Sequence, residues 1–108
     1  MLTENQIIET IEQVVGVQAC TVDVHQYQTD IVLYIDDLEN LTGYRQGFFI
    51  NNSNRCEADY MEFTRGELTP DGKSIEWSGD WDFIDDADLP AWVKDAYDRA
   101  FTAFMMLI

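Results

Sequence analysis

Cationic side chains are scarce in this sequence of 108 residues. Six Lys and Arg stand against 21 Asp and Glu, which leaves a formal net charge of −15. The six cations are spread along the chain rather than clustered: Arg45, Arg55, Arg65, Lys73, Lys94 and Arg99. Proteins that bind DNA or RNA neutralise phosphates with clustered Lys and Arg. We therefore expect no direct contact with nucleic acid and, for the same reason, no binding to an anionic membrane surface.

Motifs that carry catalysis or bind ions are missing too. His25 is the only histidine, and no nucleophile motif such as G-x-S-x-G accompanies it. The glycines are scattered and form no phosphate-binding loop. Residues 80–86 depart from the calcium-loop pattern, because Ile84 stands at ligand position 5 and Ala91 at position 12. We expect neither an enzyme nor a metal site, and no cofactor.

Cysteine is rare, and no targeting segment is visible. Cys20 and Cys56 form no C-x-x-C pair, and in a chain that is 46% hydrophobic they indicate buried thiols in a reducing compartment. The first five residues lack the basic stretch and apolar run of a signal peptide. These features predict a cytoplasmic protein.

The apolar content indicates a folded chain, since disorder requires low hydrophobicity as well as high charge. A length of 108 residues suits one domain, because domains most often run to about 100–150 residues, so we expect residues 1–108 to form a single unit. The charge is uneven within it. Residues 1–44 carry eight acidic and no basic side chains, and residues 71–108 carry nine against three. Two acidic regions thus flank a nearly neutral middle.

Periodicity predicts a helix at the N-terminus. Thr3 and Gln6 make a capping-box pattern, apolar residues follow at helical spacing as far as Val15, and Gly16 ends the run.

Strands are expected next, because the apolar period changes to two. Two strands follow from Val17 onward, joined near 26–28, and further strands are predicted at 44–50, 57–65 and 75–83.

The strand at 75–83 alternates most clearly and follows the turn sequence Thr69-Pro70-Asp71-Gly72. Its core-facing side chains should be Ile75, Trp77, Trp81 and Phe83. Its solvent-facing side chains should be Glu76, Ser78, Asp80 and Asp82. We expect one face to be core and the other acid.

A final helix should begin at Leu89-Pro90, with the aspartates of 85–88 capping it, and run to the end of the chain. The predicted fold is α+β: an N-terminal helix, an antiparallel sheet of about five strands, and a C-terminal helix packed on one face.

The candidate functional residues are acidic. Carboxylates two apart on a strand are spaced by roughly 6–7 Å, close to the roughly 7 Å between phosphates along one DNA strand. We expect nine of them to bind a partner: Asp36, Asp37, Glu39, Glu76, Asp80, Asp82, Asp85, Asp86 and Asp88. Trp92 or Tyr44 is expected to be the apolar anchor of the contact.

These features predict a small acidic inhibitor or regulator that binds a basic, nucleic-acid-binding partner protein as a DNA mimic. In size, charge and α+β layout the sequence resembles small acidic phage and plasmid proteins of the anti-CRISPR and anti-restriction kind. That resemblance involves no motif, so it assigns no residue. Three alternatives stay open: an immunity protein that neutralises a basic toxin such as a nuclease, an adaptor or homodimer that assembles through the apolar C-terminal helix, and an acidic surface that serves solubility or tolerance of salt.

Overall fold

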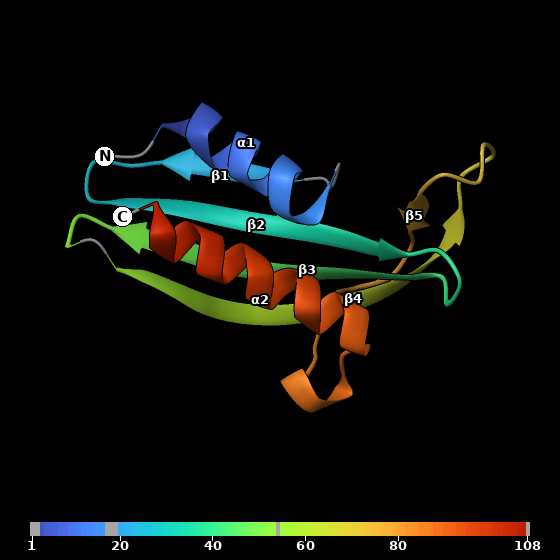
Figure 1. Cartoon of the computed structure of the whole chain (residues 1–108). Coiled ribbons are helices and arrows are strands. Elements are labelled where there is room, and N and C mark those ends of the chain that lie inside the picture. Colours follow the sequence, from blue (N-terminus) through green and yellow to red (C-terminus); the bar gives the residue numbers. More distant parts are fainter. Residues whose placement is uncertain (1–2, 17–19, 54, 108) are drawn as a thin grey trace.

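Two helices and an antiparallel sheet make up the computed structural model, which describes residues 3–16, 20–53 and 55–107 (Figure 1). The elements in chain order are α1 (Glu4–Val15), β1 (Cys20–Val24), β2 (Gln28–Asp37), β3 (Thr42–Asn51), β4 (Cys56–Leu68), β5 (Ile75–Trp77), β6 (Asp82–Phe83), a 3₁₀ helix (Asp86–Asp88) and α2 (Ala91–Met106). The strands pair in the order β1-β2-β3-β4-β5, and β6 also pairs with β4. The predicted α+β fold is confirmed. The predicted start of the first strand, at Val17, lies outside the described residues.

The N-terminal helix begins as predicted. The Thr3 hydroxyl accepts a hydrogen bond from the Gln6 amide at 3.2 Å, and the Gln6 side-chain oxygen accepts one from the Thr3 amide at 2.8 Å. This reciprocal pair satisfies amides that have no partner inside the helix. The helix stops before Gly16, whose φ of 78° suits a residue without a Cβ.

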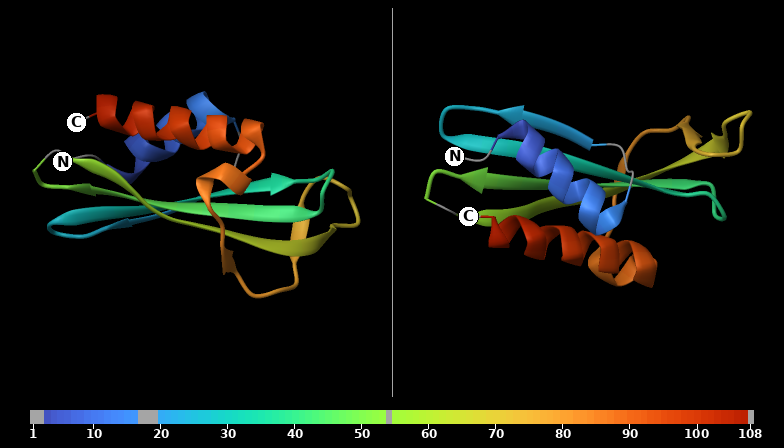
Figure 2. Two further views of the ribbon diagram at one scale, coloured as in Figure 1. Left: turned by 90° about the horizontal axis from the view of Figure 1, so that it is seen from below. Right: turned by 45° about the horizontal axis from the view of Figure 1, so that its top comes forward.

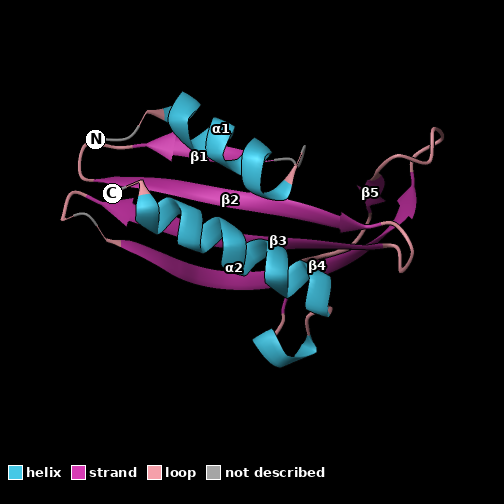
Figure 3. Cartoon of the chain, in the orientation of Figure 1, coloured by secondary structure: helices cyan, strands magenta, loops and turns pink. Residues whose placement is uncertain are grey.

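Both helices lie on the same face of the sheet (Figure 2). Every second residue of β2, from Thr29 to Asp37, is buried, so these side chains face the helices. Figure 3 shows β3 and β4 passing beneath α2, while β2 runs between α1 and α2 in that view. The residues of β2 that alternate with these buried ones, including Tyr34 and Asp36, lie on the opposite face of the sheet. That face is called here the outer face.

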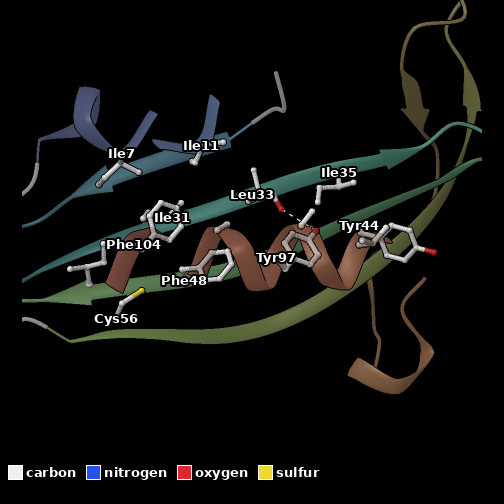
Figure 4. Close-up of a cluster of buried hydrophobic side chains, with 14 of the residues drawn as sticks. Ile7, Ile11, Ile31, Leu33, Ile35, Tyr44, Phe48, Cys56, Tyr97 and Phe104 are labelled. Atoms are coloured by element: carbon white, nitrogen blue, oxygen red, sulfur yellow. Dashed lines mark hydrogen bonds between the residues drawn. The ribbon is translucent and has the colours of Figure 1, made fainter. Parts of the chain in front are cut away.

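The core fills the space between the helices and the sheet (Figure 4). Ile7, Leu33 and Phe104 are completely buried there, and the Phe48 ring packs edge-on against Phe104 with centroids 5.4 Å apart. Tyr97 donates a hydrogen bond from its hydroxyl to the Leu33 carbonyl at 3.3 Å. That bond gives the one polar atom of a buried ring its partner.

The strand predicted at 75–83 is broken, which corrects the sequence interpretation. β5 pairs with Gly66–Leu68, whereas β6 pairs with Glu62–Phe63, and the chain between them is not a strand. Phe83 is 81% exposed instead of lying in the core. The alternation has another cause, because Trp77 and Trp81 pack on the outer face of the sheet rather than under the helices.

The start of the second helix also differs from expectation. The aspartates at 85–88 do not cap α2: Asp86–Asp88 form a separate 3₁₀ helix, and Leu89 is extended, with φ −70° and ψ 141°. Pro90 explains the break, because its ring disfavours helical geometry in the residue before it. Pro90 itself takes the N-cap position, and α2 begins at Ala91.

Candidate functional site

Six carboxylates are concentrated in residues 76–88, the stretch called here the acidic segment. All six residues are exposed, and no Lys or Arg interrupts them: Glu76, Asp80, Asp82, Asp85, Asp86 and Asp88. Among the described residues only Asp86 of this set forms an ion pair, at 3.1 Å from the Lys94 ammonium. The other five carboxylates remain available to an external cation.

One carboxylate of β2 fastens the start of this segment to the sheet. The two oxygens of Asp36 accept hydrogen bonds from the Ile75 amide and from the Trp77 indole N–H, each at 3.1 Å. Further along, the Ser78 amide donates to the Arg65 carbonyl and the Ile84 amide donates to the Met61 carbonyl. The acidic segment is therefore tied to β2 and β4 at several points.

Aromatic rings hold the segment against the outer face. Trp77 stacks on Tyr34 with centroids 5.2 Å apart, and Trp81 meets Trp77 edge-on at the same distance. The Trp77 indole occupies the space above Gly43, where an added Cβ would collide with it. Glycine at position 43 is therefore required for this packing.

A single arginine completes the packing. The Arg45 guanidinium carbon lies 4.3 Å from the centroid of the Trp81 ring, and Arg45 also pairs with Glu62 at 2.9 Å. Guanidinium groups stack well on aromatic faces, and the half-buried position strengthens the pair with Glu62. The charge of Arg45 is thus compensated by Glu62 within the fold, and Arg45 does not neutralise the neighbouring carboxylates of the acidic segment.

The structure separates the nine predicted residues into two groups. Asp36 and Asp37 serve the fold itself: Asp36 holds β5, and Asp37, only 3% exposed, accepts hydrogen bonds from the Asn40 amide and side chain at 3.2 and 2.8 Å. The other seven are exposed. Glu39 lies in the β2–β3 turn, at the same end of the sheet as β5 (Figure 1), and the rest form the acidic segment.

The exposed aromatic side chains also differ from prediction. Tyr44 is 7% exposed and belongs to the core, so it is not an anchor, whereas Trp92 is half exposed at the start of α2. Phe83 is the residue that sequence reasoning missed. Its position between Asp82 and Asp85, close after Ser78-Gly79, is the signal that the strand was interrupted there.

The single histidine of the chain lies just after β1, outside the acidic segment. His25 is exposed, and its Nε2 atom lies 3.3 Å from a carboxylate oxygen of Asp30. No group of three or more His, Cys, Asp or Glu among the described residues is arranged to hold a metal ion. Within the same residues no helix has the length and apolar character needed to cross a membrane.

Burial makes the thiols poor nucleophiles. It raises the pKa of Cys56 from 9.0 to about 11, with a smaller contribution from the negative charge of Glu57. Burial likewise raises the pKa of Cys20, helped by Glu12 and Glu4. Because only the thiolate attacks or binds metal strongly, both cysteines are packing residues at neutral pH.

Comparison of the chain with protein-family models, with curated proteins and with solved structures finds no match.

Proposed function

We propose that this protein inhibits or regulates a basic, nucleic-acid-binding protein by occupying its phosphate-binding surface with the acidic segment. The observation that carries the proposal is the set of five exposed carboxylates in 76–88 that have no cationic partner among the described residues, fixed to the sheet by Trp77, Trp81 and Asp36. A segment that is already ordered loses little conformational entropy on binding.

The mimicry proposed here does not depend on a regular spacing. Because the strand is broken between β5 and β6, the carboxylates do not follow one pleated ladder. Their effect is instead a local concentration of negative charge, which attracts a cationic surface across a Debye length of about 8–10 Å. Phe83, flanked by carboxylates and highly exposed, supplies an apolar anchor of the kind that dominates interface energies.

The test compares three baits in a nuclease-treated lysate: the natural chain, a segment variant and a matched control. The segment variant replaces five carboxylates by amides: Glu76, Asp80, Asp82, Asp85 and Asp88. The control replaces five exposed carboxylates elsewhere: Glu4, Glu9, Glu12, Asp23 and Glu57. Both variants lose the same charge, so a difference between them reports position.

The expected result is capture of a basic protein by the natural chain and the control at low salt, release at high salt, and no capture by the segment variant. Once the nuclease and unbound material have been washed away, duplex DNA added as a competitor should displace the captured protein, because both ligands use one site. Equal loss of capture by both variants, or capture that is insensitive to salt, would refute the proposal.

A second candidate is self-assembly through the end of α2, favoured by the exposure of its apolar residues. Met106 is 82% exposed, Met105 50% and Leu107 38%. Pairing of two chains that each carry −15 would be opposed by repulsion, so assembly should strengthen as salt rises, opposite to binding of a basic partner. Sedimentation velocity at low and high salt distinguishes the two, with Met106→Ser as the variant that should dissociate an assembly.

A further inference from the structure

A second feature of the outer face is a pocket of about 380 Å³ whose lining contains no residue of the acidic segment. Its lining includes the aromatic residues Phe49 and Tyr60 and the carboxylates of Asp30 and Asp59. Asp30 belongs to β2 and Asp59 to β4, the two strands that flank β3. The pocket therefore lies across β3 with negative charge contributed from both neighbours.

An irregularity in the sheet creates this hollow. The pairing of β3 with β4 shifts between Gln46 and Phe48, so that Asp59 and Tyr60 both lie opposite Gly47. The Tyr60 ring lies against Gly47, where an added Cβ would stand 2.9 Å from the ring. Bulges re-aim side chains in this way and are common beside functional sites. Here the bulge and the glycine turn Tyr60 into a wall of the pocket.

Among the described residues, no Lys or Arg lines the pocket, so the charge of its two carboxylates is only partly compensated. Asp30 accepts a hydrogen bond from the Gln28 side chain at 2.6 Å and faces His25 at 3.3 Å. Asp59 is exposed and forms no ion pair among the described residues. The lining thus offers two carboxylates and aromatic side chains to a cation that enters.

The protein already holds one guanidinium of its own between aromatic rings and a carboxylate, and Tyr60 is one of those rings. On the neighbouring part of the outer face, the Arg45 guanidinium lies 4.3 Å from the Trp81 centroid and 5.9 Å from the Tyr60 centroid, and it pairs with Glu62. Tyr60 thus stands between an internal arginine and the pocket. Aromatic faces combined with a carboxylate attract a guanidinium by cation–π and charge-assisted contacts.

We propose that this pocket accepts the guanidinium of an arginine side chain presented by the basic partner. The identity of that partner rests on the proposed function, whereas the chemistry of the pocket does not. Arginine suits the lining better than lysine, because its planar group stacks on a ring while donating to a carboxylate. An arginine in this position would fix how the partner sits on the outer face, which diffuse attraction to the acidic segment does not.

The test is a titration of the full ¹⁵N-labelled chain, followed by NMR, with three capped tripeptides that carry arginine, lysine or citrulline between glycines. Citrulline has nearly the shape of arginine without its charge. The arginine peptide should shift the amide signals of Gly47, Asp59 and Tyr60, the lysine peptide should bind more weakly, and the citrulline peptide should leave these signals in place. Equal binding of the arginine and lysine peptides would overturn the proposal.

Two pairs of variants test whether the arginine peptide binds in the pocket. Asp59→Asn should weaken arginine binding about tenfold, the cost of one charge-assisted hydrogen bond, whereas Asp71→Asn removes equal charge from a distant turn and should change little. Tyr60→Phe keeps the ring and should retain binding, whereas Tyr60→Leu should lose it. If Asp71→Asn weakens binding as much as Asp59→Asn, the attraction is diffuse and the pocket is not the site.

The experiments distinguish failure of the pocket proposal from failure of the proposed function. If the lysate experiment captures a basic protein equally well with the natural chain and with Asp59→Asn, the pocket proposal is wrong and the proposed function stands. If the arginine peptide binds at the pocket but no basic protein is captured, the pocket proposal stands and the proposed function is wrong.

Discussion

Removing the Asp36 carboxylate should loosen β5 without unfolding the protein. In the native fold this carboxylate accepts hydrogen bonds from the Ile75 amide and the Trp77 indole, each at 3.1 Å. Hydrogen bonds to a charged group contribute about 1.5–3 kcal/mol each, less where water reaches them. The Trp77 bond is exposed, so we expect Asp36→Ala to weaken the attachment of β5 by about 2 kcal/mol, which raises its opening equilibrium roughly 30-fold.

Hydrogen exchange measures this opening directly. The Ile75 amide and the Trp77 indole proton should exchange roughly 30-fold faster in Asp36→Ala, while amides in the centre of β2 and β3 keep their rates because the core is untouched. Glu76→Gln is the matched control, since it removes an equal charge from an exposed neighbour that makes no such bonds. In a chain of −15 the control should be neutral or slightly stabilising. Unchanged exchange in Asp36→Ala would refute the view that Asp36 holds the acidic segment.

Three further changes test the core, the outer-face packing and the buried thiol. Phe104→Ala should lower the free energy of unfolding in urea by about 3–5 kcal/mol, whereas the exposed Met106→Ala should stay within about 0.5 kcal/mol; similar costs would contradict the assigned core. Gly43→Ala should displace Trp77, which tryptophan fluorescence and a lower melting temperature would report, and an unaltered spectrum would count against the close contact. Because the pKa of Cys56 rises from 9.0 to about 11 on folding, the protonated thiol favours the folded state, so the stability it contributes is full below pH 9 and is lost as the pH rises toward 11. Cys56→Ser should reduce that fall in pH-dependent denaturation, and an identical profile would argue against a raised thiol pKa.

Local patterns in the sequence were enough for the N-terminal helix, for the presence of a C-terminal helix and for the central strands. The capping box at Thr3 and Gln6 satisfies its own amides within one helical turn, so the start of α1 does not depend on distant residues. The alternation that begins at Ile31 has one interpretation once a core exists, because only one face of β2 can pack under the helices. The acidic composition likewise predicts no direct contact with nucleic acid, and this stays a prediction.

At 75–83 a similar alternation led to the wrong prediction of one continuous strand facing the core. A period of two does not say which surface buries the apolar side chains. Trp77 and Trp81 are covered by Tyr34 and Arg45 on the outer face, contacts that join residues far apart in the chain. Phe83, which continues the pattern, is left exposed.

What the sequence determined by itself was the fold class, the start of the N-terminal helix, which rests on local capping, and the excess of negative charge. Tertiary structure alone decided which carboxylates are free: Asp36 is taken by Ile75, 39 positions away, and Asp37 by the turn it closes, whereas the acidic segment remains exposed. The pocket beside Tyr60 likewise depends on tertiary structure, because it forms where the register between β3 and β4 shifts at Gly47. Register and long-range hydrogen bonds depend on how the whole sheet packs, and no short stretch of sequence encodes them.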